Sequence, residues 1–140
     1  MRFVIIGCGR VGARLADMLD AEGHDVTVVD TNPDAFARLG SEFKGNAVIG
    51  TGIDEDVLRK AGVEAADGLA AVTNDDNANI MASQIAKVIF KVPRVTTRIY
   101  DPAREDVFRS LGLKAISPIR IGALRLRELL GDEAPVRTCD

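Results

Sequence analysis

The fold is constrained most by a regular alternation between short apolar runs and segments of helical periodicity. The apolar runs are largely β-branched and are bounded by Gly, Pro, Asp or Asn. They cover Arg2–Ile6, Asp25–Asp30, Ala47–Gly50, Leu69–Val72, Val95–Tyr100 and Ala115–Ser117. Runs that are apolar along their whole length are typical of strands covered on both faces. Between them, apolar residues recur three and four positions apart, which indicates amphipathic helices.

Residues that favour helix N-termini stand in front of these periodic segments. They are Pro33, Asp34, Asp54, Asp75 or Asp76, and Asp101 with Pro102. A strand followed by a helix, repeated along the chain, predicts an α/β fold with a doubly wound parallel sheet of about six strands and helices on both faces. No linker or low-complexity segment interrupts residues 1–140, so we expect a single domain.

Composition excludes several classes of protein. The 18 Lys and Arg residues against 21 Asp and Glu give a formal charge of −3, which provides no basic field for nucleic acid. No apolar stretch approaches the roughly 18 residues of a membrane-spanning helix, so we expect no transmembrane segment. The first apolar run, Phe3 to Ile6, is too short for a secretory signal.

Cysteine and histidine usage argues against a metal site. The two cysteines, Cys8 and Cys139, are far apart, and the single histidine cannot complete a ligand set with them. This usage is typical of a reducing cytosol, with Cys8 expected to be a small buried residue; a reactive thiol beside the glycine-rich turn is the alternative. The acidic run Asp54-Glu55-Asp56 is interpreted as a complement to a helix dipole rather than as a cation site.

A glycine-rich loop directly follows the first predicted strand. Its residues, Gly7, Cys8, Gly9, Arg10, Val11 and Gly12, match the pattern G-x-G-x-x-G. Gly7 permits a tight turn, Gly9 lets the backbone approach a pyrophosphate, and Gly12 allows close packing of the helix on the sheet. The free N–H groups of that helix would then face the phosphates. The loop therefore predicts a Rossmann-like sheet that binds a dinucleotide or an adenine nucleotide.

The second part of this fingerprint is Asp30, the last residue of the second predicted strand, 18 positions after Gly12. A carboxylate at this position accepts hydrogen bonds from the ribose hydroxyls of an adenosine. It also repels a 2′-phosphate, which favours NAD or an adenine nucleotide over NADP. In the alternative interpretation, Asp30 only forms a turn with Asn32 and Pro33.

Further polar residues follow the other strands, at the sheet edge where ligands bind in open α/β folds. Thr51 follows the third strand, Thr73 and Asn74 follow the fourth, and Arg98 stands within the fifth. A buried Arg98 needs an anion, either a ligand phosphate or the carboxylate of Asp75 or Asp76. These residues are candidates for nucleotide contact.

Arg10, on the first helical turn after the loop, can reach a terminal phosphate with two parallel hydrogen bonds. It is equally well interpreted as a solvated helix residue.

Together these motifs resemble the N-terminal nucleotide-binding domain of potassium-transport regulators, the RCK or KTN domain (TrkA-N). The likeness is carried by the opening Met1–Gly12, by Gly23–Asp30, by Ala71–Asn77 with Asn79, by Arg98–Pro102, and by Ile116–Pro118. It covers essentially the whole chain and is strongest with the regulatory subunit of Trk-type potassium uptake systems. Ordinary dehydrogenases lack the segment Ala71–Asn77.

The resemblance implies a cytoplasmic subunit at the inner face of the membrane, assembled as a homodimer or higher ring beneath a potassium channel or transporter. Such subunits bind NAD(H), ATP or ADP and pass the bound state to the pore. By this likeness the nucleotide contacts are Gly7 to Gly12, Asp30, Thr51, Thr73, Asn74 and Arg98. Thr51 departs from the family, many of whose members have an acidic residue there.

The resemblance also bears on domain organisation. Family members usually continue into a C-terminal ligand-sensing domain, and this sequence ends soon after Leu130. The expectation is either one domain of a longer protein or a stand-alone subunit that relies on a partner.

Enzymatic activity is the weaker interpretation. The cofactor-binding part of an NAD-dependent oxidoreductase is the alternative, and it needs an acid or base near the nicotinamide. The only histidine, His24, precedes the second strand and so lies at the wrong edge of the sheet. Tyr100 has no Tyr-x-x-x-Lys pairing. We therefore expect no catalytic residue and a regulatory rather than an enzymatic role.

Overall fold

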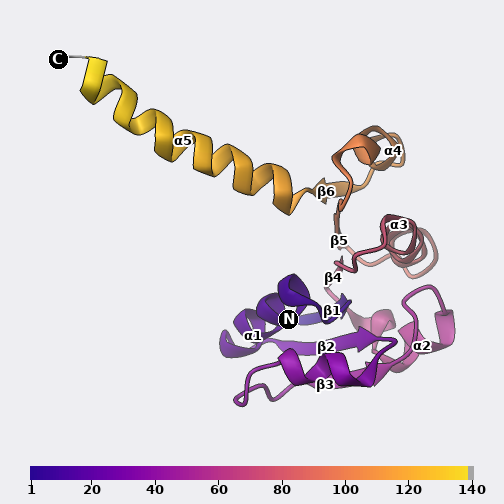
Figure 1. Cartoon of the computed structure of the whole chain (residues 1–140). Helices are drawn as coiled ribbons and strands as arrows, with labels where there is room; N and C mark the ends of the chain where they lie inside the picture. Colours follow the sequence, from indigo (N-terminus) through magenta and orange to yellow (C-terminus); the bar gives the residue numbers. More distant parts are fainter. Residues whose placement is uncertain (139–140) are drawn as a thin grey trace.

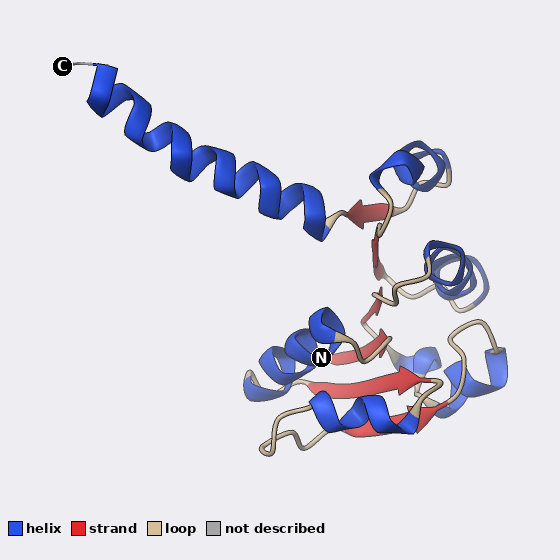
Figure 2. Cartoon of the chain, in the orientation of Figure 1, coloured by secondary structure: helices blue, strands red, loops and turns tan. Residues whose placement is uncertain are grey.

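The computed structural model describes the backbone of residues 1–138 and the side chains of residues 1–131; Cys139 lies outside the described residues. Its strands are β1 (Arg2–Ile6), β2 (Asp25–Asp30), β3 (Asn46–Ile49), β4 (Gly68–Ala71), β5 (Arg94–Arg98) and β6 (Lys114–Ile116). All neighbouring strands pair in parallel, in the order β3-β2-β1-β4-β5-β6 (Figure 2). The predicted doubly wound sheet is confirmed.

The helical segments fill every connection between strands. They are α1 (Arg10–Ala21), η1 (Pro33–Arg38), α2 (Glu55–Lys60), η2 (Val63–Ala65), α3 (Asp76–Gln84) with its π-helical continuation η3 (Ile85–Ile89), η4 (Pro102–Arg104), α4 (Glu105–Ser110) and α5 (Pro118–Thr138). Two of the predicted starts are capped as expected, by Asp54 and by Asp101. Asp75, rather than Asp76, caps α3. Asn32, rather than Asp34, caps the segment that begins at Pro33.

Two hydrophobic clusters lie on opposite faces of the sheet. Ile5, Val26 and Val28 pack with Ala13 and Ala16 of α1 on one face. On the other face Val4, Ile6 and Val29 pack with residues of α2 and α3, among them Leu58 and Ala82. The side chains of β1 and β2 thus alternate between two buried layers, because both faces are covered, and helices lie on both faces as predicted.

The outer strands of the sheet are less covered than the central ones. Asn46, Ala47 and Ile49 of β3 are exposed, as are Lys114 and Ile116 of β6. Each of these strands has one neighbour only, and the helices reach less far over the edges of the sheet than over its centre. The bounds of β3 to β6 also differ from the predicted ones by one or two residues, because their first residues, Asn46, Gly68, Arg94 and Lys114, pair where the apolar pattern alone shows no strand.

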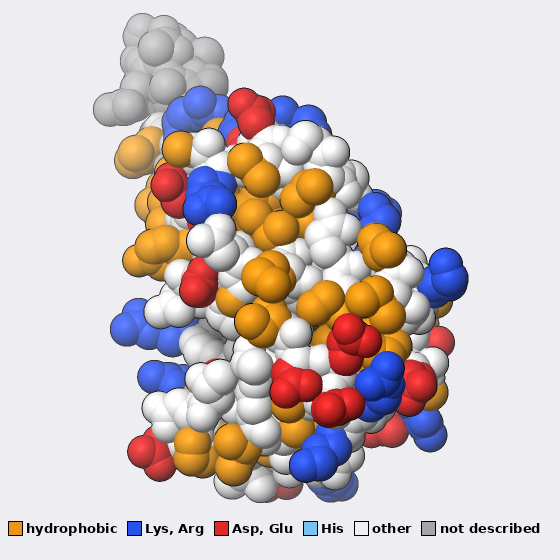
Figure 3. All heavy atoms as spheres, turned by 90° about the vertical axis from the view of Figure 1, so that its right-hand side faces the viewer, with side chains coloured by type: hydrophobic (Ala, Val, Ile, Leu, Met, Phe, Trp, Pro, Cys, Tyr) orange, Lys and Arg blue, Asp and Glu red, His pale blue; other side chains and the backbone are white. Residues whose placement is uncertain are grey.

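The last helix, α5, extends away from the sheet instead of folding back on it (Figure 1). Its large apolar side chains between Ile119 and Leu130 are therefore exposed; Leu126 is 63% accessible and Leu130 is 73% accessible. Exposed apolar side chains also gather on the side of the molecule shown in Figure 3. Outside α5, the exposed large apolar residues include Met81, Val88 and Val107. Among the helices of residues 1–138, none is both long and apolar enough to traverse a bilayer.

Candidate functional site

A cleft of about 940 Å³ runs along the carboxyl ends of β1 to β5. The polar and glycine residues predicted from the sequence meet there. Gly7, Cys8, Gly9, Arg10, Val11, Asp30, Thr51, Thr73, Asn74 and Arg98 all line it. Gly12 does not line the cleft and lies buried beneath it. The strand order reverses between β1 and β4, and open α/β sheets bind ligands at such a switch point.

The glycine loop is shaped by close approaches that exclude side chains. Gly7 has φ +106°, a conformation that favours glycine. A Cβ on Gly12 would lie 1.9 Å from the carbonyl oxygen of Gly7, so only glycine lets α1 start this close to β1. A Cβ on Gly9, by contrast, would meet no atom within 4 Å. The space beside Gly9 is open, as approach of a pyrophosphate to the backbone requires.

The N-terminus of α1 lacks a side-chain cap. Gly9 occupies the N-cap position, and no side chain accepts a hydrogen bond from the first turn. The first N–H groups of α1 therefore have no partner from a capping residue, and the helix dipole places partial positive charge at the same point. The 12-residue helix opens directly into the cleft. These features fit a phosphate group.

Asp30 forms the turn that the sequence offered as one alternative, and its carboxylate keeps room for the other role. One carboxylate oxygen accepts a hydrogen bond from the N–H of Asn32, and the other accepts one from the N–H of Cys8, each at 2.8 Å. The first bond makes the turn after β2, and the second joins this turn to the glycine loop. Each oxygen keeps a second acceptor position, and Asp30 is only half-buried. The carboxylate can thus still accept hydrogen bonds from ribose hydroxyls.

Cys8 is a buried packing residue rather than a reactive thiol. Its side chain is fully buried. Burial raises the pKa of the Cys8 thiol, and the charge of Asp30 raises it further, against an opposing influence of Arg38. The thiol therefore stays protonated and weakly nucleophilic at neutral pH. Within the described residues, no group of three or more His, Cys, Asp or Glu side chains forms a candidate metal site.

At the end of β4, the hydroxyl of Thr73 forms hydrogen bonds with α3 and within the loop that leads into this helix. The hydroxyl donates to Oδ1 of Asn79 at 2.7 Å and accepts from the N–H of Asp75 at 3.1 Å. The amide of Asn79, which is fully buried, donates to the carbonyls of Thr73 and Arg98 and so joins the ends of β4 and β5. At the same strand end, the exposed Asn74 presents its side-chain amide to the cleft.

Arg98 faces the cleft without a carboxylate. In the described side chains it takes part in no ion pair, and its buried Nε has no hydrogen-bond partner. The predicted alternative, a salt bridge to Asp75 or Asp76, is not formed. Asp75 caps α3, and the buried Asp76 accepts hydrogen bonds from the N–H groups of Tyr100 and Asp101. The guanidinium of Arg98 is thus able to bind an anion from outside the protein.

Asn32, Arg38 and Tyr100 also line the cleft, although they were not predicted as site residues. Asn32 and Arg38 lie on the side of Asp30, and Nη1 of Arg38 donates to the carbonyl of Cys8 at 3.4 Å. Tyr100 lies on the other side, with its ring centroid 5.5 Å from the guanidinium of Arg98. Asn32 and Arg38, two and eight residues beyond β2, belong to no motif that predicts a nucleotide contact. Tyr100 lies within the segment Arg98–Pro102 that carries the family resemblance, but the contact predicted there was that of Arg98 alone.

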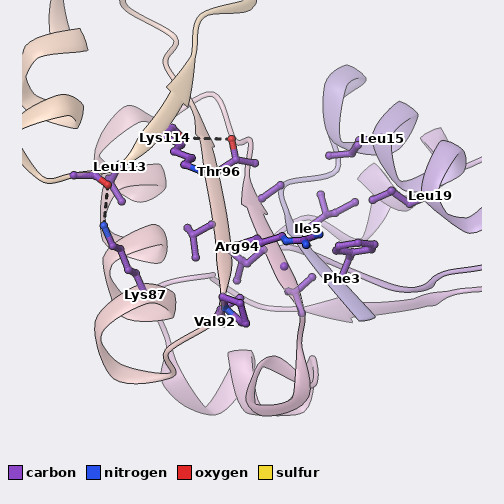
Figure 4. Close-up of a pocket in the computed structure, with 17 residues that line it drawn as sticks. Phe3, Ile5, Leu15, Leu19, Lys87, Val92, Arg94, Thr96, Leu113 and Lys114 are labelled. Carbon is purple, nitrogen blue, oxygen red and sulfur yellow. Dashed lines mark hydrogen bonds between the residues drawn. The ribbon is translucent and has the colours of Figure 1, made fainter. Parts of the chain in front are cut away.

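A second hollow, of about 440 Å³, lies on the face of the sheet that α5 leaves open (Figure 4). Its floor is apolar and comes from strands β1, β4 and β5 and from α1. Phe3, Ile5, Leu15, Leu19, Val92 and Leu113 line it. Lys87, Arg94 and Lys114 also line it, and Nζ of Lys87 donates to the carbonyl of Gly112 at 2.8 Å. This hollow is separate from the cleft.

Comparison with known proteins gives consistent matches. The chain is 48% identical over 131 residues to the Trk system potassium uptake protein TrkA of Streptomyces coelicolor, covering 93% of this chain and 59% of that protein. The chain thus spans about three fifths of that relative's length. The TrkA-N domain of the inner membrane protein ybaL from Escherichia coli superimposes with a TM-score of 0.81 at 22% identity, over 92% of this chain and 96% of that one.

A structure of GsuK bound to ADP superimposes with a TM-score of 0.78 at 26% identity, over 94% of this chain and 34% of that chain. The family model of the TrkA-N domain matches residues 3–118, which include the glycine loop, Asp30 and the loops that follow β4 and β5. On the sheet order, the cleft and this match, the chain belongs to the TrkA-N domain family.

Proposed function

We propose that this chain is a nucleotide-sensing regulatory module that binds NAD(H), ATP or ADP and controls a membrane potassium channel or transporter. The observation that carries the proposal is one cleft in which the uncapped N-terminus of α1 and the carboxylate of Asp30 lie together. Family membership and the names of the relatives support the regulatory role. The GsuK structure bound to ADP supports an adenine nucleotide as the ligand.

The residues of the cleft fit each part of such a ligand. The open space at Gly9 and the free N–H groups of α1 suit the diphosphate. Asp30 suits the adenosine ribose, and its charge disfavours the 2′-phosphate of NADP. Thr51 lines the cleft after β3, next to where the adenine edge would lie. Arg98, which forms no ion pair with the described side chains, would complement negative charge on the β4–β5 side.

Arg10 would let the site distinguish a nucleoside diphosphate from a nucleoside triphosphate. It is exposed on the first turn of α1 and lines the cleft. A triphosphate reaches farther toward this guanidinium than a diphosphate does, so the two ligands would contact Arg10 differently. Only such a difference in binding energy can shift a conformational equilibrium. The bound nucleotide would in this way set the state of the pore.

We place the chain in the cytoplasm, peripheral to the inner face of the membrane and held there by its channel or transporter partner. We also propose that it forms a homodimer or a higher ring. Two apolar surfaces have no partner within the described residues: the exposed side of α5 and the hollow lined by Phe3, Leu15 and Leu19. A second copy that brings its own α5 would bury both surfaces at once.

Isothermal titration of the purified chain with NADH, ADP and ATP tests the proposal. We expect saturable heats with at least one of them, and a different affinity for ADP than for ATP that an Arg10→Ala variant abolishes. Absence of heat with all three nucleotides would contradict nucleotide sensing and leave only a scaffold role. Turnover of NADH with a panel of small carbonyl compounds would instead support the oxidoreductase alternative.

A further inference from the structure

The cleft extends beyond the residues that suit an adenosine and its diphosphate. Its adenosine side, at β2 and β3, holds Asp30 and Thr51, and the glycine loop occupies the middle. Beyond the point where the strand order reverses, it continues over the ends of β4 and β5, where Asn74, Arg98 and Tyr100 line it. ADP would fill the first side and the loop only. The β4–β5 side of the cleft therefore has room for another chemical group of the ligand. The side chain of Tyr100 indicates which kind of group would bind there.

Tyr100 presents an aromatic face there. It follows β5, is 49% accessible, and lines the cleft. The guanidinium of Arg98 lies 5.5 Å from the centroid of its ring, in the range of a cation–π contact. A half-exposed ring that is already supported by a cation offers its remaining surface for stacking with another planar ring.

The position of Tyr100 is held by the backbone. The carboxylate of Asp76 accepts hydrogen bonds from the N–H of Tyr100 at 2.6 Å and from the N–H of Asp101 at 3.0 Å. Asp76 is itself buried at the start of α3, only 8% accessible. The loop that carries Tyr100 is thus hydrogen-bonded to the first turn of α3, the helix that follows β4. Such anchoring lowers the entropy that stacking would otherwise cost.

We propose that Tyr100 is a specificity-determining residue that stacks on the second ring of a dinucleotide and so favours NAD(H) over ADP and ATP. The inference rests on the proposed nucleotide site and names its preferred ligand class. A terminal phosphate could bind the guanidinium of Arg98, but it could not stack on the ring of Tyr100. A nicotinamide ring, which is planar and joined to the adenosine through the diphosphate, suits both the extension of the cleft over the ends of β4 and β5 and the aromatic face.

Calorimetric titration of Tyr100→Ala and Tyr100→Phe with NADH and with ADP tests this role. In Tyr100→Ala we expect NADH to bind about five- to a hundredfold more weakly, the range found when a stacking aromatic is removed. ADP should bind within about twofold of its original affinity, because it does not reach the ring. Tyr100→Phe keeps the ring and should retain NADH affinity; thermal melting of each variant checks that the fold persists.

Intrinsic fluorescence gives an independent measurement. The chain has a single tyrosine and no tryptophan, so tyrosine emission reports Tyr100 alone. Saturation with NAD⁺ should quench this emission, and ADP should leave it unchanged after correction with free tyrosine amide at the same nucleotide concentration. Equal effects of the two ligands, or NADH affinity unaltered in Tyr100→Ala, would overturn the inference. If neither nucleotide binds the unmodified chain, the proposed function itself fails.

Discussion

At the scale of single residues, three aspartates that look alike in the sequence do three different things. Asp30 joins the turn after β2 to the glycine loop while keeping acceptor positions free toward the cleft. Asp75 caps α3 by accepting from the N–H groups of Asn77 and Ala78. Asp76, the next residue, is buried and ties down the loop after β5. Backbone donors, rather than cations, satisfy all of them, which leaves Arg98 free.

Asp30 should control nucleotide affinity. In Asp30→Ala we expect NADH and ADP to bind roughly ten- to a hundredfold more weakly, because the ribose hydroxyls lose their acceptor. Isothermal titration measures the change. Asp25→Ala, at the other end of the same strand, is the matched control and should leave the affinity as it was. Unaltered dissociation constants in Asp30→Ala would remove this residue from the site.

Cys8 should make the protein less stable in alkali. Burial raises the pKa of its thiol in the native state. Between the unfolded and the native pKa, the native state holds a proton that the unfolded chain has released. The free energy of unfolding therefore falls as pH rises through this window, by up to about 1.4 kcal/mol per pH unit. Below the unfolded pKa this contribution is complete.

Denaturant titrations of the original chain and of Cys8→Ala at a series of alkaline pH values measure this effect. The original chain should lose stability more steeply than the variant, and Cys139, present in both, cancels in the comparison. Parallel pH profiles would show that the Cys8 thiol titrates alike in the native and unfolded states.

At the scale of elements, α1 and α5 both have apolar residues at helical spacing, but these residues are buried in α1 and exposed in α5. In α1, the residues Ala13 and Ala16 face the sheet and are buried. In α5, Ile119, Leu126 and Leu130 are exposed because the helix leaves the sheet (Figure 1). Such spacing shows that a helix has apolar surface, but not what covers it.

Self-association should depend on α5. Deletion of the residues after Pro118 should shift the chain toward monomer, and so should Leu126→Lys, which places a charge on the exposed apolar face. Arg125→Lys keeps the charge and serves as the matched control. Sedimentation velocity over a range of concentrations measures the effect. The same sedimentation coefficients for all four proteins would exclude α5 from the interface between copies.

At the scale of the whole molecule, the cleft exists because the winding of the sheet reverses. Connections from β1 to β2 and on to β3 place α1 and η1 on one face, and those from β3 through β4 to β5 place α2 and α3 on the other. Helices diverge from one another at the β1–β4 boundary, and the loops that carry the site surround the gap. A ligand there would contact loops from five strands.

Ligand binding should therefore stabilise the entire domain. At about a hundred times the dissociation constant, a nucleotide that binds only the folded chain adds about 2.7 kcal/mol, which raises the melting temperature by several degrees. Differential scanning calorimetry with ADP or NADH measures the shift. Asp30→Ala should need correspondingly more ligand for the same shift. A melting temperature that neither ADP nor NADH changes would show that the two nucleotides do not bind in the cleft.

The sequence by itself determined the fold class, because strand and helix periods, caps and glycine spacing are local properties that agree with one another along the chain. The bounds of β1 and β2 follow from it directly, since both strands are continuous apolar runs with clear ends. The position of the cleft was predictable for the same reason: parallel strands bring their carboxyl ends to one edge, so Gly9, Asp30 and Thr73 had to meet.

Only the tertiary structure decided how each polar group is satisfied. Arg98 could have paired with Asp75 or Asp76, but α3 and the loop after β5 supply backbone donors that bind these carboxylates first. Arg38 and Tyr100 enter the cleft because separate loops converge in space, which no local pattern encodes. The direction of α5 could not be predicted from a local pattern either. Periodicity shows that the helix has an apolar face, whereas the surface that covers this face depends on contacts between distant parts of a chain or between chains.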